Sequence, residues 1–400
     1  MKRPHTIATV LLCAACGTGT PGANPTSTSL STVGSTSSVT TVADTIAAST
    51  SSSTSSSTTV ADSTSTAPVG ASTAAADPKR FDPIIDEWTA GSADVSVVVW
   101  RNGRVVHEWV RSRRGDLTAS ARFRIASISK VVTALTVLRL VDAGSIDLDQ
   151  PVLEQLSKDT GWPLGDPRME AITTRHLLAH LSGFASNPDL FFASPNTSPD
   201  DVVRSLLGGV LETDPGSSFE YSNANFVLLG RIIEMVTGRS YVDVAKAEVL
   251  NPLGIDDAEY ASTDSWSPGD ARHYVRPGRN YMELLGPAGA WVMSAKSVAV
   301  VLAAADPDGS GSLLSRRLSR MMVSPSSAGV DDGSWTYGLG IRIFPDGSWG
   351  HTGTIESVRA VALRLTDGTI LVVLVNGDAP RVTDEFVAAL LFANVLDRLP

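Results

Sequence analysis

A long stretch of low sequence complexity limits how much of this chain can fold. From about Gly17 to Ala76 the residues are almost entirely Ser, Thr, Ala, Gly and Val, with no aromatic side chain and almost no charge. Such a segment buries too little apolar surface to offset the entropy lost on ordering. We therefore expect residues 17–77 to form a disordered tether and residues 78–400 to form one folded domain with a large core.

The first residues have the three-part pattern of an export signal. Two basic residues precede the apolar run 7–12, which is too short to span a bilayer. The motif Ala-Ala-Cys-Gly at 14–17 resembles the cleavage and acylation site of bacterial lipoproteins, although Cys13 stands where that pattern prefers Leu. Residues 1–16 are predicted to be a lipoprotein-type signal peptide with Cys16 as the lipidated residue. We expect a protein anchored at the outer face of the cytoplasmic membrane, or a secreted one if Cys16 is not acylated.

Charge and cysteine content exclude several other functions. The formal net charge of -10 and the pI of about 5.1 lack the electrostatic footprint of a nucleic-acid binder. Cys13 and Cys16 are the only two cysteines, so the folded domain has no disulfide, zinc–thiolate site or cysteine nucleophile. We expect no cofactor, no metal and no nucleic-acid partner, and we expect a monomer.

The hydrophobic pattern predicts a sheet built from both ends of the domain. Two β-rich runs flank Asn102-Gly103, a strong hairpin signal. Strands are predicted at 95–100, 104–110, 337–344, 348–353, 358–365 and 370–376, and a last amphipathic helix at 383–398. The stretch between them has helical spacing at 128–141, 174–180, 200–207 and 224–236. These elements predict an α+β fold, in which an antiparallel sheet flanked by helices carries a mainly helical insertion.

One predicted helix places a serine and a lysine one turn apart. Ser127-Ile128-Ser129-Lys130 opens a helix that is apolar on nearly every side and is therefore expected at the domain centre. Packing lowers the pKa of a buried lysine, which can then help to remove the serine proton. The positive end of the helix also favours an oxyanion. The plainer interpretation is a helix N-cap followed by a solvated lysine.

Two further motifs follow in the order and approximate spacing of penicillin-recognising serine enzymes. They are Tyr221-Ser222-Asn223 and His351-Thr352-Gly353, and each pattern occurs once in the sequence, as does S-x-x-K. Supporting stretches lie at 123–130, 175–183, 215–223 and 337–340. On these residues the sequence resembles the serine β-lactamase and penicillin-binding protein family, in the branch of class C β-lactamases with D-alanyl-D-alanine carboxypeptidases and esterases. The resemblance covers essentially all of residues 80–400.

The resemblance implies a β-lactamase/transpeptidase-like fold and a serine hydrolase that works through an acyl-enzyme. Ser127 is then the nucleophile, Lys130 its activator, and Tyr221 the relay of protons to and from the leaving group. Asn223 is implied to hold Lys130 and the acylamino side chain of a substrate. The backbone N–H groups of Ser127 and Thr354 are implied to form the oxyanion hole.

The third motif departs from most β-lactamases of this family, which carry lysine where this chain has His351. Histidine followed by Thr352 and Gly353 resembles a D-alanyl-D-alanine carboxypeptidase. Because a histidine is only partly charged near neutrality, a second cation is needed to bind a substrate carboxylate. Arg342 is the candidate. A two-residue loop at Asp346-Gly347 places it opposite His351 on one sheet face, and a solvated strand arginine is the alternative.

The histidine pair His176 and His180 has the spacing of two metal ligands on one helix. The sequence between them lacks the glutamate of a zinc protease, and the family resemblance implies a structural helix there. No metal role is expected.

We expect a substrate of the peptidoglycan-peptide, ester or β-lactam type, with D-Ala-D-Ala carboxypeptidase-type amide hydrolysis as the first interpretation. An esterase or a β-lactamase of the same fold is the alternative, because these activities differ mainly in pocket shape and deacylation rate. From another class, a non-catalytic lipoprotein could keep the fold to bind peptidoglycan fragments or partners. The complete set of motif residues argues against that alternative.

Overall fold

A computed structural model describes residues 77–89, 93–186, 188–192, 196–326, 333–377 and 383–396. The predicted signal peptide, the predicted lipidation site Cys16 and the tether up to residue 76 lie outside the described residues. Within these ranges, no helix combines the length and the apolar character needed to cross a bilayer.

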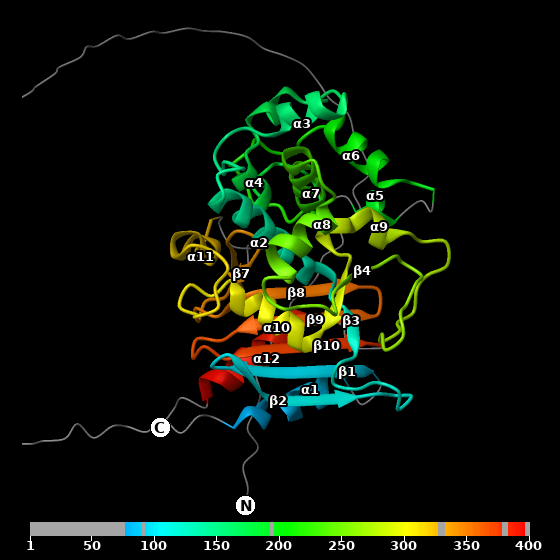
Figure 1. The fold of residues 1–400 in the computed structure, drawn as a ribbon, viewed down its shortest axis with the longest axis vertical. Helices are drawn as coiled ribbons and strands as arrows, with labels where there is room; N and C mark the ends of the chain where they lie inside the picture. The colour runs from blue at the N-terminus through cyan, green and yellow to red at the C-terminus, as the bar shows by residue number, and fades with distance from the viewer. Residues whose placement is uncertain are drawn as a thin grey trace, which may run out of the picture. The chain divides into compact units, whose positions relative to one another are not determined.

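The strands from both ends of the domain form one antiparallel sheet, as the sequence predicts (Figure 1). The single strand predicted at 337–344 is wrong, because two short strands, 336–337 and 342–343, pair with each other there. Within the described ranges its order is β2-β1-β10-β9-β8-β7-β6. The strands are β1 (Asp94–Arg101), β2 (Arg104–Arg111), β6 (Thr336–Tyr337), β7 (Arg342–Ile343), β8 (Trp349–Ile355), β9 (Val358–Arg364) and β10 (Ile370–Asn376). Val97 of β1 pairs with Val373 of β10, so residues far apart in sequence are neighbours at the centre of the sheet.

The hairpin between β1 and β2 forms where the sequence predicts it. Arg101 pairs with Arg104 across a two-residue loop. Asn102 and Gly103 have φ angles of 52° and 75°, the left-handed pair that a type I′ turn requires. Asparagine and glycine adopt this conformation more readily than other residues, which explains why the signal is reliable.

Both faces of the sheet are covered by helices. Alternate residues of β1 point to opposite faces, and Val97 packs in a cluster with helices α1 (Asp82–Thr89) and α12 (Thr383–Leu396). Val98 packs on the other face in the cluster that includes α10 (Ala295–Ala304), which lies across the sheet in Figure 1. Because both faces are buried at the centre of the sheet, β1 and β10 are nearly continuous runs of apolar residues rather than alternating ones.

The helical insertion surrounds helix α2 (Ser129–Asp142), which is buried along most of its length, as predicted. Its neighbours include α7 (Asn223–Thr237) and α8 (Tyr241–Ala245), and α4 (Thr174–Leu178) packs against α7. The remaining helices and helical turns are η1 (Pro78–Phe81), η2 (Ala126–Ile128), α3 (Leu153–Thr160), η3 (Pro167–Ala171), α5 (Pro188–Phe192), α6 (Pro199–Leu207), η4 (Lys246–Leu250), α9 (Tyr281–Leu285), η5 (Gly286–Ala288) and α11 (Arg316–Met322).

A second, smaller sheet was not predicted. It has the order β3-β5-β4 and consists of β3 (Arg122–Arg124), β5 (Trp291–Ser294) and β4 (Glu259–Tyr260). These strands are too short to show an alternating pattern, and their partners are distant in sequence, as in the pairing of Arg124 with Val292. The small sheet connects directly to the turn before α2.

The loop between β7 and β8 is one residue longer than predicted. The N–H of Phe344 donates to the carbonyl of Ser348 at 2.8 Å, which closes a loop of residues 345–347. Gly347 adopts φ of 86° at its end, the arrangement of a three-residue hairpin loop with a left-handed last residue. As a result Arg342 pairs with Gly350, and the predicted pairing of Arg342 with His351 is wrong by one position.

Candidate active site

The serine of the first motif lies in the turn that joins β3 to α2. Ser127 is in the helical turn η2, and the α-helix itself begins two residues later. Ala126 has φ of 48°, a left-handed conformation that costs a non-glycine residue about 1–3 kcal/mol. The turn is fixed from both sides, because Ile125 N–H donates to Trp291 O at 3.1 Å and Ile128 N–H donates to Ile125 O. This geometry presents Ser127 at the wall of a cavity.

Strand β8 passes directly against the backbone of this turn. A Cβ atom on Gly353 would lie 2.5 Å from the carbonyl oxygen of Ile125 and 3.1 Å from the nitrogen of Ser127. Only glycine permits so close an approach. The glycine of the third motif therefore brings β8 alongside the serine of the first.

Lys130 is completely buried and points at Ser127. Its Nζ donates to Ser127 Oγ at 3.0 Å, to Asn223 Oδ1 at 2.8 Å and to the carbonyl of Ala288 at 2.9 Å. Burial lowers the pKa of Lys130, because removing an ammonium group from water disfavours its charged form. A lysine with a lowered pKa has more of the neutral amine that can accept the serine proton.

Tyr221 completes the group around the serine. Lys130 Nζ lies 5.1 Å from the centroid of its ring, and the phenol hydrogen-bonds with the side chains of Ser127 and Lys130. Burial raises the pKa of Tyr221, but the positive charges of Lys130 and Arg342 and these hydrogen bonds outweigh burial, so the net pKa is lowered. The phenol can therefore exchange protons with both neighbours.

A cavity of about 220 Å³ opens onto the serine. Its walls are formed by the turn η2, the start of α7, strands β7 and β8 and the segment around η5. The lining residues are Ser127, Phe192, Tyr221, Asn223, Leu285, Gly289, Arg342, Thr352, Thr354 and Ile355. Ser127 and Thr354 thus lie on the same cavity, and their role as an oxyanion hole stays a prediction.

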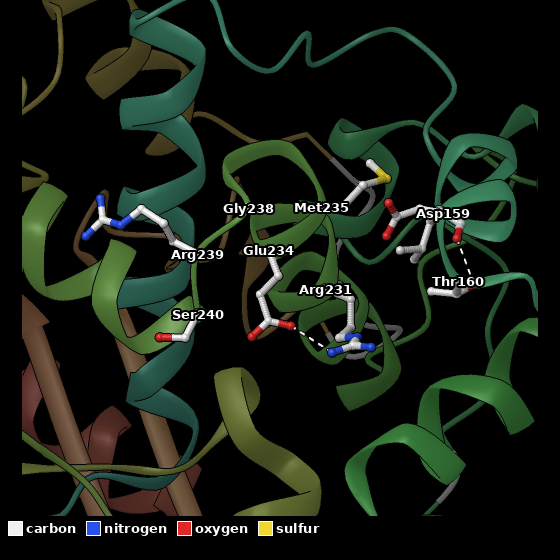
Figure 2. A pocket seen from close by; sticks show the side chains of 9 residues that line it. Asp159, Thr160, Arg231, Glu234, Met235, Gly238, Arg239 and Ser240 are labelled. Carbon is white, nitrogen blue, oxygen red and sulfur yellow. Dashed lines mark hydrogen bonds and ion pairs between the residues drawn. The ribbon is translucent and has the colours of Figure 1, made fainter.

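A larger groove lies elsewhere, on the helical insertion (Figure 2), and has a volume of about 450 Å³. Arg231 on its wall is paired with Glu234 at 2.9 Å and with Asp200 at 3.1 Å. The hydroxyl of Ser240 on its wall donates to Asp243 at 2.7 Å. This groove has no serine beside a buried amine, so the smaller cavity at Ser127 is the candidate active site.

Comparison with known proteins agrees with this geometry. The family model described as "Beta-lactamase" matches residues 81–394. The chain belongs to the β-lactamase family. The fold predicted from the sequence, a β-lactamase/transpeptidase-like arrangement of helices around an antiparallel sheet, is confirmed.

Solved structures of β-lactamase-family folds align over most of the chain. A D-stereospecific amidohydrolase from a Streptomyces species is 25% identical, with a TM-score of 0.66, over 78% of this chain and 98% of that one. The octameric penicillin-binding protein homologue from Pyrococcus abyssi is 23% identical, with a TM-score of 0.67, over 80% and 77%. A D-amino acid amidase from Ochrobactrum anthropi is 24% identical, with a TM-score of 0.65, over 79% and 99%.

Curated relatives match over shorter stretches. "Probable fimbrial assembly protein FimD, serogroup H1" from Dichelobacter nodosus is 34% identical over 39% of this chain, and "Protein flp" from Staphylococcus aureus is 31% identical over 46% of it. The aligned stretch spans 41% and 38% of the length of these relatives. Because less than half of each relative's length is covered, these matches do not decide the activity of this chain.

In this β-lactamase-family site, the histidine of the third motif is buried beside the cavity. His351 Nδ1 lies 2.6 Å from the carbonyl of Thr352, so this nitrogen carries the proton, and Nε2 accepts from the hydroxyl of Tyr337 at 2.9 Å. Burial, followed by the charges of Arg342 and Lys130, holds the pKa of His351 well below its usual value. The expectation of a partly charged imidazole near neutrality is therefore wrong, and its catalytic role stays a prediction.

Arg342 reaches the cavity even though its predicted pairing is wrong. Opposite Gly350, it shares a sheet face with the cavity residues Thr352 and Thr354. Its guanidinium lies 4.3 Å from the ring centroid of Trp335, and its side chain is 14% exposed. The alternative of a solvated strand arginine is thus not what the structure shows.

His180 is a site residue whose role the sequence did not reveal. The two histidines considered as metal ligands have other partners: His176 Nδ1 accepts from the N–H of Thr173, and the buried His180 Nδ1 accepts from the N–H of Ser222 at 3.2 Å and from Asn225 Nδ2 at 2.8 Å. His180 therefore fixes the backbone of the loop between Tyr221 and Asn223. Only its place in the 175–183 stretch marks it in the sequence.

Buried histidines should make the folded domain sensitive to acid. Burial lowers the pKa of His180 and His351 well below the usual value and that of His273 to about 3. The unfolded chain, with histidine pKa values near 6.5, then binds more protons than the folded chain as the pH falls below that value. The free energy of unfolding should fall by about 1.4 kcal/mol per pH unit for each histidine. Urea titrations at pH 7.5, 6 and 5 measure this slope, and a flat profile would contradict the buried neutral imidazoles.

Proposed function

We propose that this protein is a serine hydrolase that cleaves amide bonds of D-amino-acid peptides through an acyl-enzyme on Ser127. The observation that carries the proposal is the 3.0 Å contact between Ser127 Oγ and the buried Lys130 Nζ at the wall of a cavity. A hydroxyl in reach of an amine with a lowered pKa is the arrangement that an activated serine needs.

The proposed reaction has two halves. Ser127 Oγ attacks the carbonyl carbon and passes its proton to Lys130 or Tyr221, and the tetrahedral intermediate collapses as the leaving amine takes a proton through Tyr221. Water then attacks the ester carbonyl, and its proton returns to Ser127 Oγ by the same route. Asn223 supports this assignment, because its carbonyl oxygen accepts from Lys130 and its amide N–H groups remain for a substrate oxygen.

Arg342 supports a carboxypeptidase-type substrate. It is the guanidinium on the wall of the cavity, whereas His351 is buried and its lowered pKa keeps it neutral. Guanidinium groups bind carboxylates strongly where water is largely excluded. A peptide ending in D-alanine would place its terminal carboxylate there.

Hydrolysis of D-amino-acid amides or of simple esters is the second candidate. Its support is the likeness to solved structures described as a D-stereospecific amidohydrolase and a D-amino acid amidase. Such substrates have no carboxylate on the leaving side and do not require Arg342. An efficient β-lactamase ranks third, because deacylation of a β-lactam depends on how water is placed in the pocket.

A labelling experiment tests the proposal. Fluorescent penicillin and a fluorophosphonate probe should each form a covalent adduct, and a panel of D-Ala-D-Ala peptides, D-amino-acid amides, short esters and a chromogenic cephalosporin should rank the activities. Absence of both labelling and turnover would support a binding protein that keeps the fold.

Replacing Arg342 by Ala should change the preference for carboxylate-bearing over neutral substrates more than it changes the overall activity. We expect kcat/KM for a peptide with a free terminal carboxylate to fall about tenfold further than kcat/KM for a neutral ester, because only the former loses a charged partner. The ratio is the measurement, since Arg342 also lowers the pKa values of Tyr221 and Lys130. For Arg342→Lys, the ratio of the two kcat/KM values should lie between the native ratio and that of Arg342→Ala. Equal losses on both substrates would refute the assignment.

We propose further that the domain is exported and tethered through a lipid on Cys16. The support is the residue pattern at 1–17, which lies outside the described residues. Mass spectrometry of the mature N-terminus should find a diacylated Cys16. An unmodified residue after a cut elsewhere would show a secreted protein.

A further inference from the structure

The first turn of helix α12 lies at the mouth of the cavity that holds Ser127. The hydroxyl of Thr383, the first residue of α12, is 3.4 Å from the hydroxyl of Thr354 on the cavity wall. The next residue, Asp384, accepts a hydrogen bond from Arg342 Nη1 at 3.3 Å and forms an ion pair with it. A carboxylate of the protein itself therefore pairs with the arginine of the cavity.

Besides its contact with Asp384, Arg342 packs against aromatic rings and has little access to solvent. Its guanidinium lies 4.3 Å from the ring centroid of Trp335 and 5.8 Å from that of Tyr221. Its Nε is buried and has no hydrogen-bond partner among the described residues. A cation held between aromatic rings, where water cannot screen it well, attracts any anion that enters the cavity.

Asp384 differs from its partner in exposure. Its side chain is 58% exposed, against 14% for Arg342, so the carboxylate can move into water without breaking a packed core. The start of a helix also favours a negative charge at this position. Asp384 is thus a persistent but displaceable anion at the rim of the cavity.

We infer that Asp384 is a specificity-determining residue that competes with the substrate carboxylate for Arg342. In the free enzyme Arg342 is paired internally, so a substrate with a terminal carboxylate must displace Asp384, whereas an amide or ester need not. Asp384 therefore reduces the preference of the site for peptides with a free C-terminal carboxylate over amides and esters. The inference rests on the proposed function of the cavity.

The size of the effect follows from the exposure of the pair. An ion pair with one partner largely in water is weak, and its loss should change the relative kcat/KM by roughly two- to fivefold. The change should appear mainly in KM, because Asp384 lies at the rim and not at the scissile bond.

The test compares two substrates that share one scissile bond, an N-acyl-D-Ala-D-Ala peptide and its C-terminal amide. Asp384→Asn keeps the size of the side chain and removes its charge. We expect the ratio of kcat/KM for the acid to that for the amide to rise two- to fivefold, and to stay unchanged when the same substitution is made in an Arg342→Ala background. A ratio that stays level or falls, or a rise that persists without Arg342, would overturn the inference.

Asp86→Asn is the matched control. Asp86 lies in α1, is also 58% exposed and forms an ion pair of 3.0 Å with Arg111. Neither residue lines the cavity. This substitution should leave the ratio unchanged, which separates an effect at Arg342 from a general loss of surface charge.

A binding measurement separates this inference from the proposed function. Calorimetry with N-acetyl-D-alanine on the Ser127→Ala variant, with and without Asp384→Asn, reports carboxylate binding without any turnover. A two- to fivefold gain in affinity supports the inference even if the native enzyme proves inactive on every peptide tested. Unchanged affinity overturns it even if the peptides are hydrolysed.

Discussion

Replacing Ser127 by Ala should abolish covalent labelling by fluorescent penicillin and reduce hydrolysis by roughly 10⁴-fold or more, as is typical when a nucleophile is removed. The Oγ atom is the group that lies 3.0 Å from Lys130 Nζ, and no other hydroxyl is expected to replace it. Gel fluorescence and initial rates measure the two effects. The side chain is small and lies at the cavity wall, so thermal unfolding should shift little.

Ser145→Ala is the control for this change. Ser145 is an exposed serine just beyond the other end of α2, and its removal should leave labelling and turnover intact. Persistent labelling of the Ser127→Ala variant would move the nucleophile elsewhere and would remove the basis of the proposed reaction.

Replacing Lys130 by Met should slow acylation by roughly 10³-fold, the scale of a lost general base. Methionine is similar in length but cannot accept a proton, so Ser127 stays protonated. The native acylation rate should rise with pH through the lowered pKa of Lys130, and the variant should lose this rise. Single-turnover labelling across pH measures both effects.

The same substitution leaves the carbonyl of Ala288 and Asn223 Oδ1 without their lysine donor. Circular dichroism must therefore show that the variant is folded before its rate is interpreted. Lys158→Met removes an exposed lysine that pairs with Glu154 and should change neither the rate nor its pH dependence. A Lys130→Met rate within tenfold of the native one would exclude Lys130 as the base.

The main sheet could be predicted from the sequence because its signals are local. Asn102-Gly103 determines a turn by its own backbone preferences, and the apolar runs 358–364 and 370–376 mark buried strands without reference to their partners. The small sheet could not be predicted in this way. Arg124 and Val292 pair only because the helical insertion brings them together.

The candidate site likewise has residues that could be predicted from the sequence and residues that could not. The motif residues Ser127, Lys130 and Tyr221 could be identified from their spacing, and the structure places all three together. The environment of His351 could not, because its neutral state depends on Tyr337 and on burial by other elements. Asp384 carries no sequence signal at all, since its contact with Arg342 depends on how α12 packs against the sheet.

The pairing of β1 with β10 determines when this domain can fold during synthesis. Strand β1 lies between β2 and β10, so the β1 edge of the first hairpin stays unpaired until residues 370–376 have left the ribosome. Contacts that join the two ends of a chain give high contact order and slow folding. An unpaired strand edge is also a template for aggregation. A nascent chain arrested before β10 is therefore a target for chaperones rather than a smaller working enzyme.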